Sequence, residues 1–478
     1  MKRPIVSTVG ICVLALTCSA SVTYKAKLNW HECTAQESAY PKTVAEIQNI
    51  IQTGKPPFKA IGALHSTSDV ICTSGTVINM ASFDSFSIDT ATHTVTVGSG
   101  AHLQNVQSAL QSAGYALIHT TQFGGISIAG GMGTGAHGST LRHNSNLGEM
   151  TIQLKAVLAN GTVATFNQDS DLRHWRTHLG FLGVVFEVTL NIVPLFKVHA
   201  SISHYSESIL DDLGTLATDQ DTFMAWWYPN IEKVVTYTGK FVDVATSGSG
   251  VWNLVPDVSP IVQDLLSVPL DLQADWCVLE YATYSDMVGN VLVRDVTSLI
   301  RPPFLTTGNG LYSSSAVGYP ASMIMSTCSP ESDCTWSSFQ VASFAVAVPI
   351  ERFADAIAII QDILSKTPFC LPLTGIFFRF SAATDTSMAV EYKRTTVHIE
   401  LDTLIVDGVE PSYGRTFLRR LVTEVEGRMH WGKNSRDDFY AIYPLQNITA
   451  GTKEFILYAS TIDPNGVFRN DFSTLLGV

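Results

Sequence analysis

The chain has 478 residues, of which 46% are hydrophobic and 15% are charged, and its formal net charge is −13. This length allows two or three domains with substantial cores, and the composition is that of a globular protein. The excess of acidic side chains argues against nucleic acid, or an anionic membrane surface, as a binding partner.

The N-terminus has the pattern of a secretory signal peptide. Lys2 and Arg3 precede an apolar run at 11–16, and small residues follow at Cys18-Ser19-Ala20. The apolar run is too short to span a bilayer, so no stable membrane span is predicted. We expect residues 1–20 to be removed and the protein to be secreted. An uncleaved membrane anchor is the alternative.

Removal of that segment would leave six cysteines, namely Cys33, Cys72, Cys277, Cys328, Cys334 and Cys370. An even number in an oxidising compartment indicates disulfide bonds. Cys328 and Cys334 flank a short polar loop and form the expected local pair, whereas Cys33–Cys72 and Cys277–Cys370 are our hypothesis for the others. No cysteine spacing suggests zinc, and no metal is predicted. Sequons at Asn160 and Asn447 fit a secreted glycoprotein.

The first half of the chain predicts an α+β domain with short strands and few helices. Thr43 and Glu46 have the spacing of a capping box at the start of a helix. A second helix, at 102–113, is closed by Gly114. The expected strands lie at 58–61, 76–80, 94–97, 151–158 and 183–193, with a hairpin turn at Asn160-Gly161.

The character changes near Pro194. Beyond it, aromatic-rich strands are expected at 223–228 and 339–348, with a helix at 350–364. Two further strands are expected at 376–380 and 395–401. This part of the chain is therefore a second α+β domain.

The stretch from Gly124 to Leu141 holds seven glycines in eighteen residues. Glycine is favoured where the backbone must take a positive φ or approach another group closely. The residues between the glycines are small, so we expect a run of free backbone N–H groups that binds a phosphate or pyrophosphate. A glycine-rich structural loop is the alternative.

Two separated motifs resemble one family. The turn GALHSTSD around His65, followed by AGGMGTGAHGS at 129–139, resembles the FAD-binding (PCMH-type) domain of the vanillyl-alcohol-oxidase superfamily. His430-Trp431-Gly432-Lys433 resembles the HWxK signature of the aldonolactone oxidoreductases, and the segment around Arg379 is similar to the plant-type L-gulonolactone oxidases. The resemblance implies an FAD-binding domain at 30–197, a substrate-binding cap domain at 198–425, and a C-terminal segment at 426–478 that returns to the FAD domain.

The resemblance also implies FAD, bonded covalently through His65, and neutral imidazole is a competent nucleophile for such a link. A histidine that only hydrogen-bonds the flavin is the alternative. The residues expected around the cofactor are Gly62, Ala63, Leu64, Ser66, Ser68, Asp69, Thr121, Gln122, Gly130, Gly131, Gly133, Thr134, Gly135, His137, Gly138, Ser139, Val184, Val185 and His430.

Four residues are the catalytic candidates. Arg379 lies in an otherwise apolar strand, where a guanidinium needs a polar partner such as a lactone oxygen, unless it forms a structural salt bridge. By the resemblance, Lys433 would place positive charge near the flavin. Many relatives carry a glutamate at the position of Phe377, so a carboxylate must come from elsewhere or none is used. His398 and Glu400 alternate on one strand face and are nominated as base and hydroxyl-binding group, or else as a cross-strand polar pair.

These expectations describe a secreted FAD-dependent oxidoreductase that oxidises a secondary alcohol of an aldono-1,4-lactone, with L-gulono-1,4-lactone as the default substrate. Dioxygen or another acceptor would take the electrons. Thr121 has an intermediate size at a position where a small residue eases oxygen access, so whether the enzyme is an oxidase or a dehydrogenase stays open. A polyol or sugar oxidase is the same-fold alternative, and a catalytically degenerate binding protein is the alternative of another class.

Overall fold

The computed structural model describes residues 21–27, 31–229, 232–253, 304–325, 340–366, 375–405 and 412–478. The predicted signal peptide, Cys277, Cys328, Cys334 and Cys370 lie outside these ranges. No helix within the described ranges has the length and apolar content that crossing a membrane requires.

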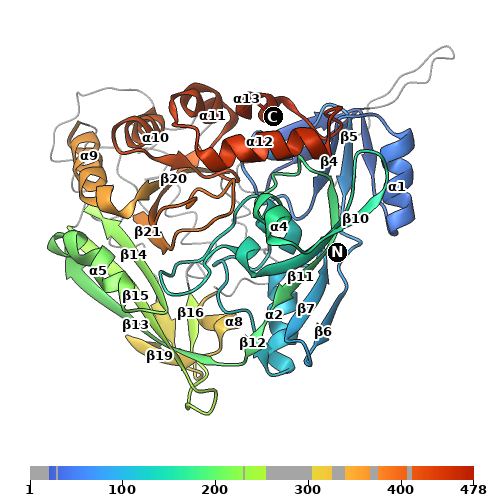
Figure 1. Cartoon of the computed structure of the whole chain (residues 1–478). Coiled ribbons are helices and arrows are strands. Elements are labelled where there is room, and N and C mark those ends of the chain that lie inside the picture. The colour runs from blue at the N-terminus through green and yellow to red at the C-terminus, as the bar shows by residue number, and fades with distance from the viewer. Residues whose placement is uncertain are drawn as a thin grey trace.

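The N-terminal half contains two sheets. A parallel three-stranded sheet has the order β3 (Glu37–Ala39), β5 (Thr76–Asn79) and β4 (Phe58–Ile61), with α1 (Val44–Thr53) between β3 and β4 in the chain. An antiparallel five-stranded sheet has the order β10 (Val163–Phe166), β9 (Thr151–Val157), β11 (Val184–Asn191), β7 (Thr94–Gly98) and β6 (Phe86–Asp89). A hairpin of β1 (Val22–Lys25) and β2 (Glu32–Ala35) precedes both sheets, and α2 (Leu103–Ser112) and α4 (Asp169–Trp175) complete this half (Figure 1).

An eight-stranded sheet forms the second half. Its central strands are β14 (Thr222–Tyr228), β21 (Ile376–Ser381), β22 (Thr396–Ile405) and β20 (Gln340–Pro349), with β23 (Arg428–Met429) at one edge. On the other side lie β15 (Lys233–Val242), β13 (Lys197–Ser206) and β19 (Ser315–Gly318). A small separate sheet joins β16 (Val251–Asn253), β17 (Phe304–Thr306) and β18 (Tyr312–Ser313).

Two helices cover one apolar face of the large sheet. α9 (Phe353–Lys366) places Phe353 against Phe378 of β21, with ring centroids 5.2 Å apart. The helix α10 (Ser412–Glu424) lies beside β20 (Figure 1). Its Gly414 packs directly on the ring of Phe344 in β20. Since side chains alternate along a strand, the opposite face of β21 and β22 carries Arg379, Ser381, His398 and Glu400. The helices therefore leave the polar face free to form a site.

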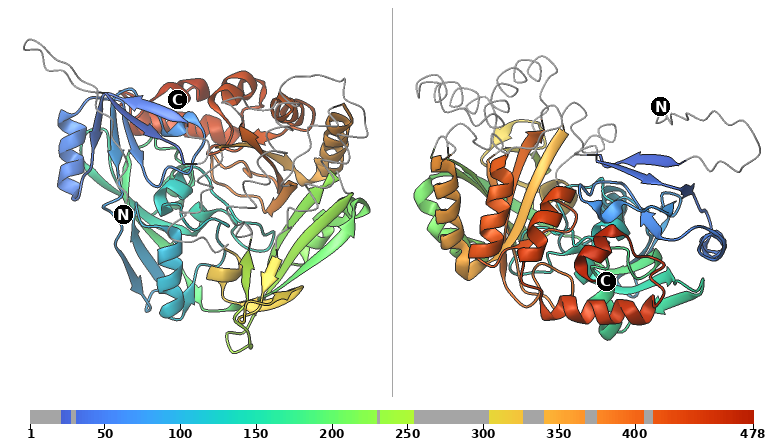
Figure 2. Two further views of the ribbon diagram at one scale, coloured as in Figure 1. Left: turned by 180° about the vertical axis from the view of Figure 1, so that it is seen from behind. Right: turned by 90° about the horizontal axis from the view of Figure 1, so that it is seen from above.

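The last fifty residues pack against the N-terminal half, as the red helices in both views of Figure 2 show. They form α11 (Arg436–Ile442), α12 (Ala450–Ile462) and α13 (Asp471–Leu476). The N–H of Phe58 donates to the carbonyl of Val467 at 2.9 Å, and the amide of Asn470 donates to the carbonyl of Cys72 at 2.7 Å. The N-terminal domain is thus completed by the end of the chain.

Several local predictions are confirmed. Thr43 caps α1 by accepting from the N–H of Glu46, and Asn160-Gly161 turns β9 into β10. The Cys33–Cys72 disulfide is present. The helix cap and the hairpin turn were predictable from the sequence because each depends on residues close to it in the chain.

Candidate active site

The glycine-rich stretch forms a short helix, α3 (Ile128–Gly133), where a loop with free amides was predicted. Within the stretch the N–H groups of Gly131, Thr134 and Ala136 donate to main-chain carbonyls, and that of Gly138 donates to Ser145. The N–H of Gly135 donates to Met132. The amides of these five residues are therefore not free for a pyrophosphate, because the helical turn and its exit already satisfy them.

The glycines instead permit close approach. A Cβ on Gly62 would lie 1.9 Å from the Oγ of Ser127, and a Cβ on Gly130 would lie 2.6 Å from the same oxygen. A Cβ on Gly138 would lie 2.2 Å from Nδ1 of His119. The N–H of Ala63 also faces Ser127 Oγ, at 3.4 Å. The turn at His65 and the glycine stretch, separate in sequence, are therefore packed together without intervening side chains.

His65 is held as a neutral imidazole in this region. The preceding residue, Leu64, takes a positive φ of 59°, and its carbonyl accepts from the N–H of Lys27. Burial, with the nearby charges of Lys27 and His102, lowers the pKa of His65 to about 4. Its Nε2 is buried and has no hydrogen-bond partner among the described residues. An uncharged imidazole with an available nitrogen is what nucleophilic attachment requires.

Other buried polar atoms without partners in the described chain belong to the same segments. Both ring nitrogens of His119, the hydroxyl of Thr120, and Nε2 of His137 and of His178 have none. Buried polar groups in native proteins nearly always have partners, so such a concentration marks a place for a polar ligand. FAD, with its diphosphate, hydroxylated chain and heteroatom-rich rings, fits this set of donors and acceptors.

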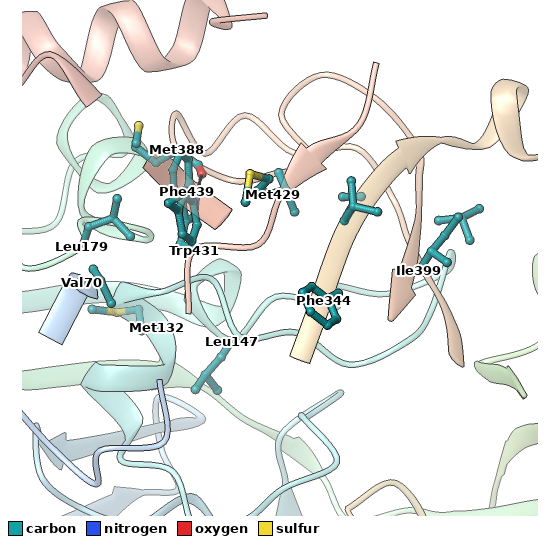
Figure 3. Packing of buried hydrophobic residues seen from close by; sticks show 14 of the residues in the cluster. Val70, Met132, Leu147, Leu179, Phe344, Met388, Ile399, Met429, Trp431 and Phe439 are labelled. Carbon is teal, nitrogen blue, oxygen red and sulfur yellow. Dashed lines mark hydrogen bonds between the residues drawn. The ribbon is translucent and has the colours of Figure 1, made fainter. Parts of the chain in front are cut away.

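The motif His430-Trp431-Gly432-Lys433 lies against the turn around His65 and the glycine-rich stretch, which together we call the cofactor segments. The carbonyl of Gly432 accepts from the N–H of Thr67 at 2.9 Å, and that of Trp431 accepts from the hydroxyl of Ser68 at 2.6 Å. A Cβ on Gly432 would lie 3.2 Å from Ser66 Oγ and 3.3 Å from the Cβ of Thr134. Figure 3 shows Trp431 beside Phe439 in the core that both halves share.

Three of the four catalytic candidates form one ion-pair network. Arg379 of β21 and Lys433 each donate to Glu400 of β22, one to each carboxylate oxygen. A second guanidinium nitrogen of Arg379 donates to the carbonyl of His137 at 2.8 Å, which joins the network to the glycine stretch. Burial lowers the pKa of Arg379 to about 9 and that of Lys433 to about 8, which leaves both mainly cationic at neutral pH.

The strand register shows where the carboxylate comes from. Phe377 faces Glu400 directly across β21 and β22, as Arg379 faces His398. The carboxylate of this site is thus supplied by the neighbouring strand, directly opposite Phe377. The ring of Phe377 stacks on Trp226 of β14, with centroids 4.6 Å apart, and lies beneath the guanidinium of Arg379.

His398, the fourth candidate, belongs to a group of buried histidines. Its ring stacks on that of His137 with centroids 3.6 Å apart, and the ring centroids of His137 and His430 are 5.5 Å apart. Burial is the main cause that lowers the pKa of all three, so they are neutral at neutral pH. Nε2 of His398 lies 2.9 Å from Ser381 Oγ and 3.2 Å from a carboxylate oxygen of Glu391.

Two residues expected to line the cofactor have structural roles. Both carboxylate oxygens of Asp69 have partners, Nε2 of His31 at 2.6 Å and the guanidinium of Arg436 at 2.7 Å. The hydroxyl of Ser139 donates to the carbonyl of Phe223 and accepts from the N–H of Phe380 at 2.9 Å. These polar atoms connect parts of the protein to one another, and a contact of either residue with the cofactor stays a prediction.

Four other residues expected around the cofactor lie in β11 and just before the glycine-rich stretch. Val184 and Val185 are buried in β11 and pair with β9. Thr121 donates its hydroxyl to the carbonyl of Phe123 at 2.9 Å, and the side-chain amide of Gln122 contacts Met224 of β14. Sequence reasoning missed Glu391, His119 and His178, since each is an isolated polar residue with no motif around it.

Family models and known proteins match most of the chain. A model described as an FAD binding domain matches residues 36–167, and one described as D-arabinono-1,4-lactone oxidase matches residues 329–475. The L-gulono-1,4-lactone dehydrogenase of Mycobacterium tuberculosis is 25% identical over 93% of this chain and 97% of its own. L-gulonolactone oxidase 2 of Arabidopsis thaliana is 24% identical over 98% of this chain and 85% of its own.

Solved structures show the same fold. Cholesterol oxidase from B. sterolicum superposes with a TM-score of 0.69 at 15% identity, over 98% of this chain and 100% of that one. BBE-like 1 of Physcomitrella patens gives a TM-score of 0.57 at 15% identity, over 90% of this chain and 89% of that one. The fold and the site thus define an FAD-dependent oxidoreductase with a PCMH-type FAD-binding domain. Within that class, the chain is similar to L-gulonolactone oxidases and dehydrogenases over more than nine tenths of its length.

Proposed function

We propose that this enzyme oxidises a secondary hydroxyl of L-gulono-1,4-lactone to the ketone and passes the electrons to dioxygen, which forms hydrogen peroxide. The observation that carries the proposal is the network of Arg379, Glu400 and Lys433 on the polar face of the large sheet, joined by Arg379 to the glycine stretch. The names of the relatives supply the substrate class.

The network suits a neutral, polyhydroxylated substrate. Arg379 keeps its Nε without a partner in the described chain, and Lys433 is partly exposed, so both can donate to lactone oxygens. Glu400 holds the two cations in fixed positions, and this pre-organisation lowers the entropy lost on orienting the substrate. The ring of Phe377 offers an apolar surface next to these polar groups.

The residues divide the chemistry between them. FAD, when bound, accepts the hydride from the hydroxyl-bearing carbon. His398, neutral through burial, is a group of the polar face that can accept the hydroxyl proton, whereas both oxygens of Glu400 are already occupied by cations. Arg379 and Lys433 place positive charge where negative charge develops.

We also propose that the cofactor is attached covalently through His65 and that the mature protein is secreted after removal of residues 1–20. The neutral, unpartnered imidazole of His65 supports the first. The charged, apolar and small-residue order of the N-terminus supports the second. N-terminal sequencing of the secreted protein tests the second, since an uncleaved anchor would retain Met1.

A substrate panel tests the main proposal. The purified yellow protein is mixed anaerobically with aldonolactones, open-chain alditols and free sugars, and bleaching of the flavin absorbance is followed. We expect rapid bleaching by L-gulono-1,4-lactone, and Arg379→Lys should slow it at least tenfold because the two-pronged guanidinium is lost. Bleaching by alditols or sugars alone would make it a polyol or sugar oxidase, and bleaching by none would favour a binding protein. Hydrogen peroxide formed in air distinguishes an oxidase from a dehydrogenase.

A further inference from the structure

Glu391 is a buried carboxylate in the loop between β21 and β22, beside the imidazole of His398. Its residue is 1% exposed, and neither side-chain oxygen has a well-formed hydrogen bond within the described ranges. An ionised carboxylate is costly to bury unless a cation or strong donors compensate it. Nε2 of His398 lies 3.2 Å from Oε1 of Glu391, and this histidine is only 2% exposed.

The loop between β21 and β22 holds Glu391 in place through its backbone. The carbonyl of Glu391 accepts from the N–H of Thr384 at 3.3 Å and from that of Arg394 at 3.1 Å. The guanidinium of Arg428 donates to the carbonyls of both neighbours, Val390 and Tyr392, at 2.9 Å. The carboxylate is therefore fixed beside the imidazole without contributing its own oxygens to that support.

His398 presents its other nitrogen to the site. Ser381 and Glu391 occupy Nε2, and no described residue forms a hydrogen bond with Nδ1. A carboxylate next to one ring nitrogen of a histidine favours the tautomer that carries the proton there, which leaves the other nitrogen as the acceptor. Arg379 lies directly across the strand pair, so Nδ1 belongs to the same face as the substrate-binding cations.

We propose that Glu391 is a positioning residue that makes His398 the base of the oxidation. It holds the proton of the neutral imidazole on Nε2, so that Nδ1 takes the proton of the substrate hydroxyl as that O–H bond breaks. The carbon loses hydride with its electron pair to FAD, and the carbonyl forms. The carboxylate then stabilises the imidazolium until the proton leaves. This inference rests on the proposed function, because it assigns the proton that the oxidation releases.

The charged groups around His398 determine the direction in which its pKa should move when Glu391 is changed. Arg379 and Lys433 oppose its protonation, Glu391 favours it, and His137 and His430 are neutral beside it. Burial is the largest influence and lowers the pKa of His398 below its ordinary value. Removal of the charge of Glu391 must lower this pKa further.

The test compares Glu391→Gln with the wild-type holoenzyme. The rate of flavin bleaching by lactone is measured from acid to neutral pH. We expect the acid limb to move to lower pH and the plateau to fall roughly tenfold or more, because a weaker base accepts the proton less readily. Glu149→Gln is the matched control, since Glu149 accepts from Thr384 and Thr386 of the same loop but does not contact His398. This control should lower the melting temperature and leave the acid limb of the pH–rate profile unchanged.

A second measurement needs no substrate. With ¹⁵N-labelled histidine in the holoenzyme, the nitrogen shifts of His398, assigned with His398→Gln, report its tautomer. We expect the Nε2–H form in the wild type and a mixed population in Glu391→Gln. Unchanged shifts together with an unchanged limb would overturn the assignment of Glu391. If no lactone bleaches the wild type, the proposed function fails and the nitrogen shifts alone decide the role of Glu391.

Discussion

The charge network at the centre of the site is tested most directly by Glu400→Gln. This substitution keeps the shape of the side chain but leaves Arg379 and Lys433 without their shared carboxylate. Removing one partner of a buried ion pair costs about 3–5 kcal/mol, because the remaining charge is left uncompensated. The side chain of Lys433 is 25% exposed and Arg379 keeps the carbonyl of His137, so we expect a loss near the lower end, about 3 kcal/mol.

This loss converts into a measurable shift. With an unfolding entropy of about 2.1 cal/mol/K per residue, a chain of 478 residues gives about 1 kcal/mol/K, so the melting temperature should fall by about 3 °C. Scanning calorimetry of the two purified proteins at pH 7 provides the measurement. Glu424→Gln is a suitable control, because Glu424 pairs with Arg420 on the exposed surface of α10, where a lost pair has little effect.

The pH dependence provides a second, independent check. The pKa of Lys433 is about 8 in the folded protein and 10.5 as its ordinary value, so the unfolded chain binds more protons between these limits. Stability therefore rises with pH across this window. Above pH 8 the folded Lys433 loses its charge, and its ion pair with Glu400 no longer contributes to stability. The loss of stability caused by Glu400→Gln should therefore be smaller at pH 9.5 than at pH 7. An equal melting temperature at pH 7, or a cost that grows with pH, would refute the coupling of these three residues.

Three further substitutions have defined outcomes. His65→Ala should release the flavin into the supernatant after acid precipitation, and flavin that stays with the polypeptide would place the attachment elsewhere. Gly62→Ala should lower the ratio of flavin to protein absorbance, since its Cβ would lie 1.9 Å from a neighbouring hydroxyl, whereas Gly214→Ala, with ordinary contacts from 3.5 Å, should not. Cys72→Ser should lower the free energy of unfolding by about 4 kcal/mol, because the lost bridge closes a loop of 39 residues. Thermal melting with and without reductant checks this value, and equal curves would contradict it.

Sequence reasoning succeeded where a residue's role depends on its near neighbours. The Thr43 cap, the strand at 58–61 and the turn at Asn160 were all predictable from local pattern. The two cofactor segments were recognisable because glycine and small residues at such density have few other uses. Whether the amides of that stretch are free was not predictable, since their carbonyl partners depend on the turn of helix that forms.

The arrangement of the charges could not be predicted because it depends on strand register. Nothing in the sequence says that Phe377 faces Glu400, or that the 382–395 loop brings Glu391 against His398. A shift of one residue in this pairing would turn Glu400 to the apolar face. The candidates were identified by residue type, but their partnership required the folded sheet.

The position of the last fifty residues has a consequence for how the protein matures. Val467 supplies a main-chain acceptor to Phe58, and Trp431 and Gly432 lie on the turn at Ser66–Ser68. A ribosome delivers these contacts after both the turn at His65 and the glycine stretch, so neither segment has them until residues 431–467 have been translated. We therefore expect a chain truncated before residue 428 to bind no flavin and to emerge colourless.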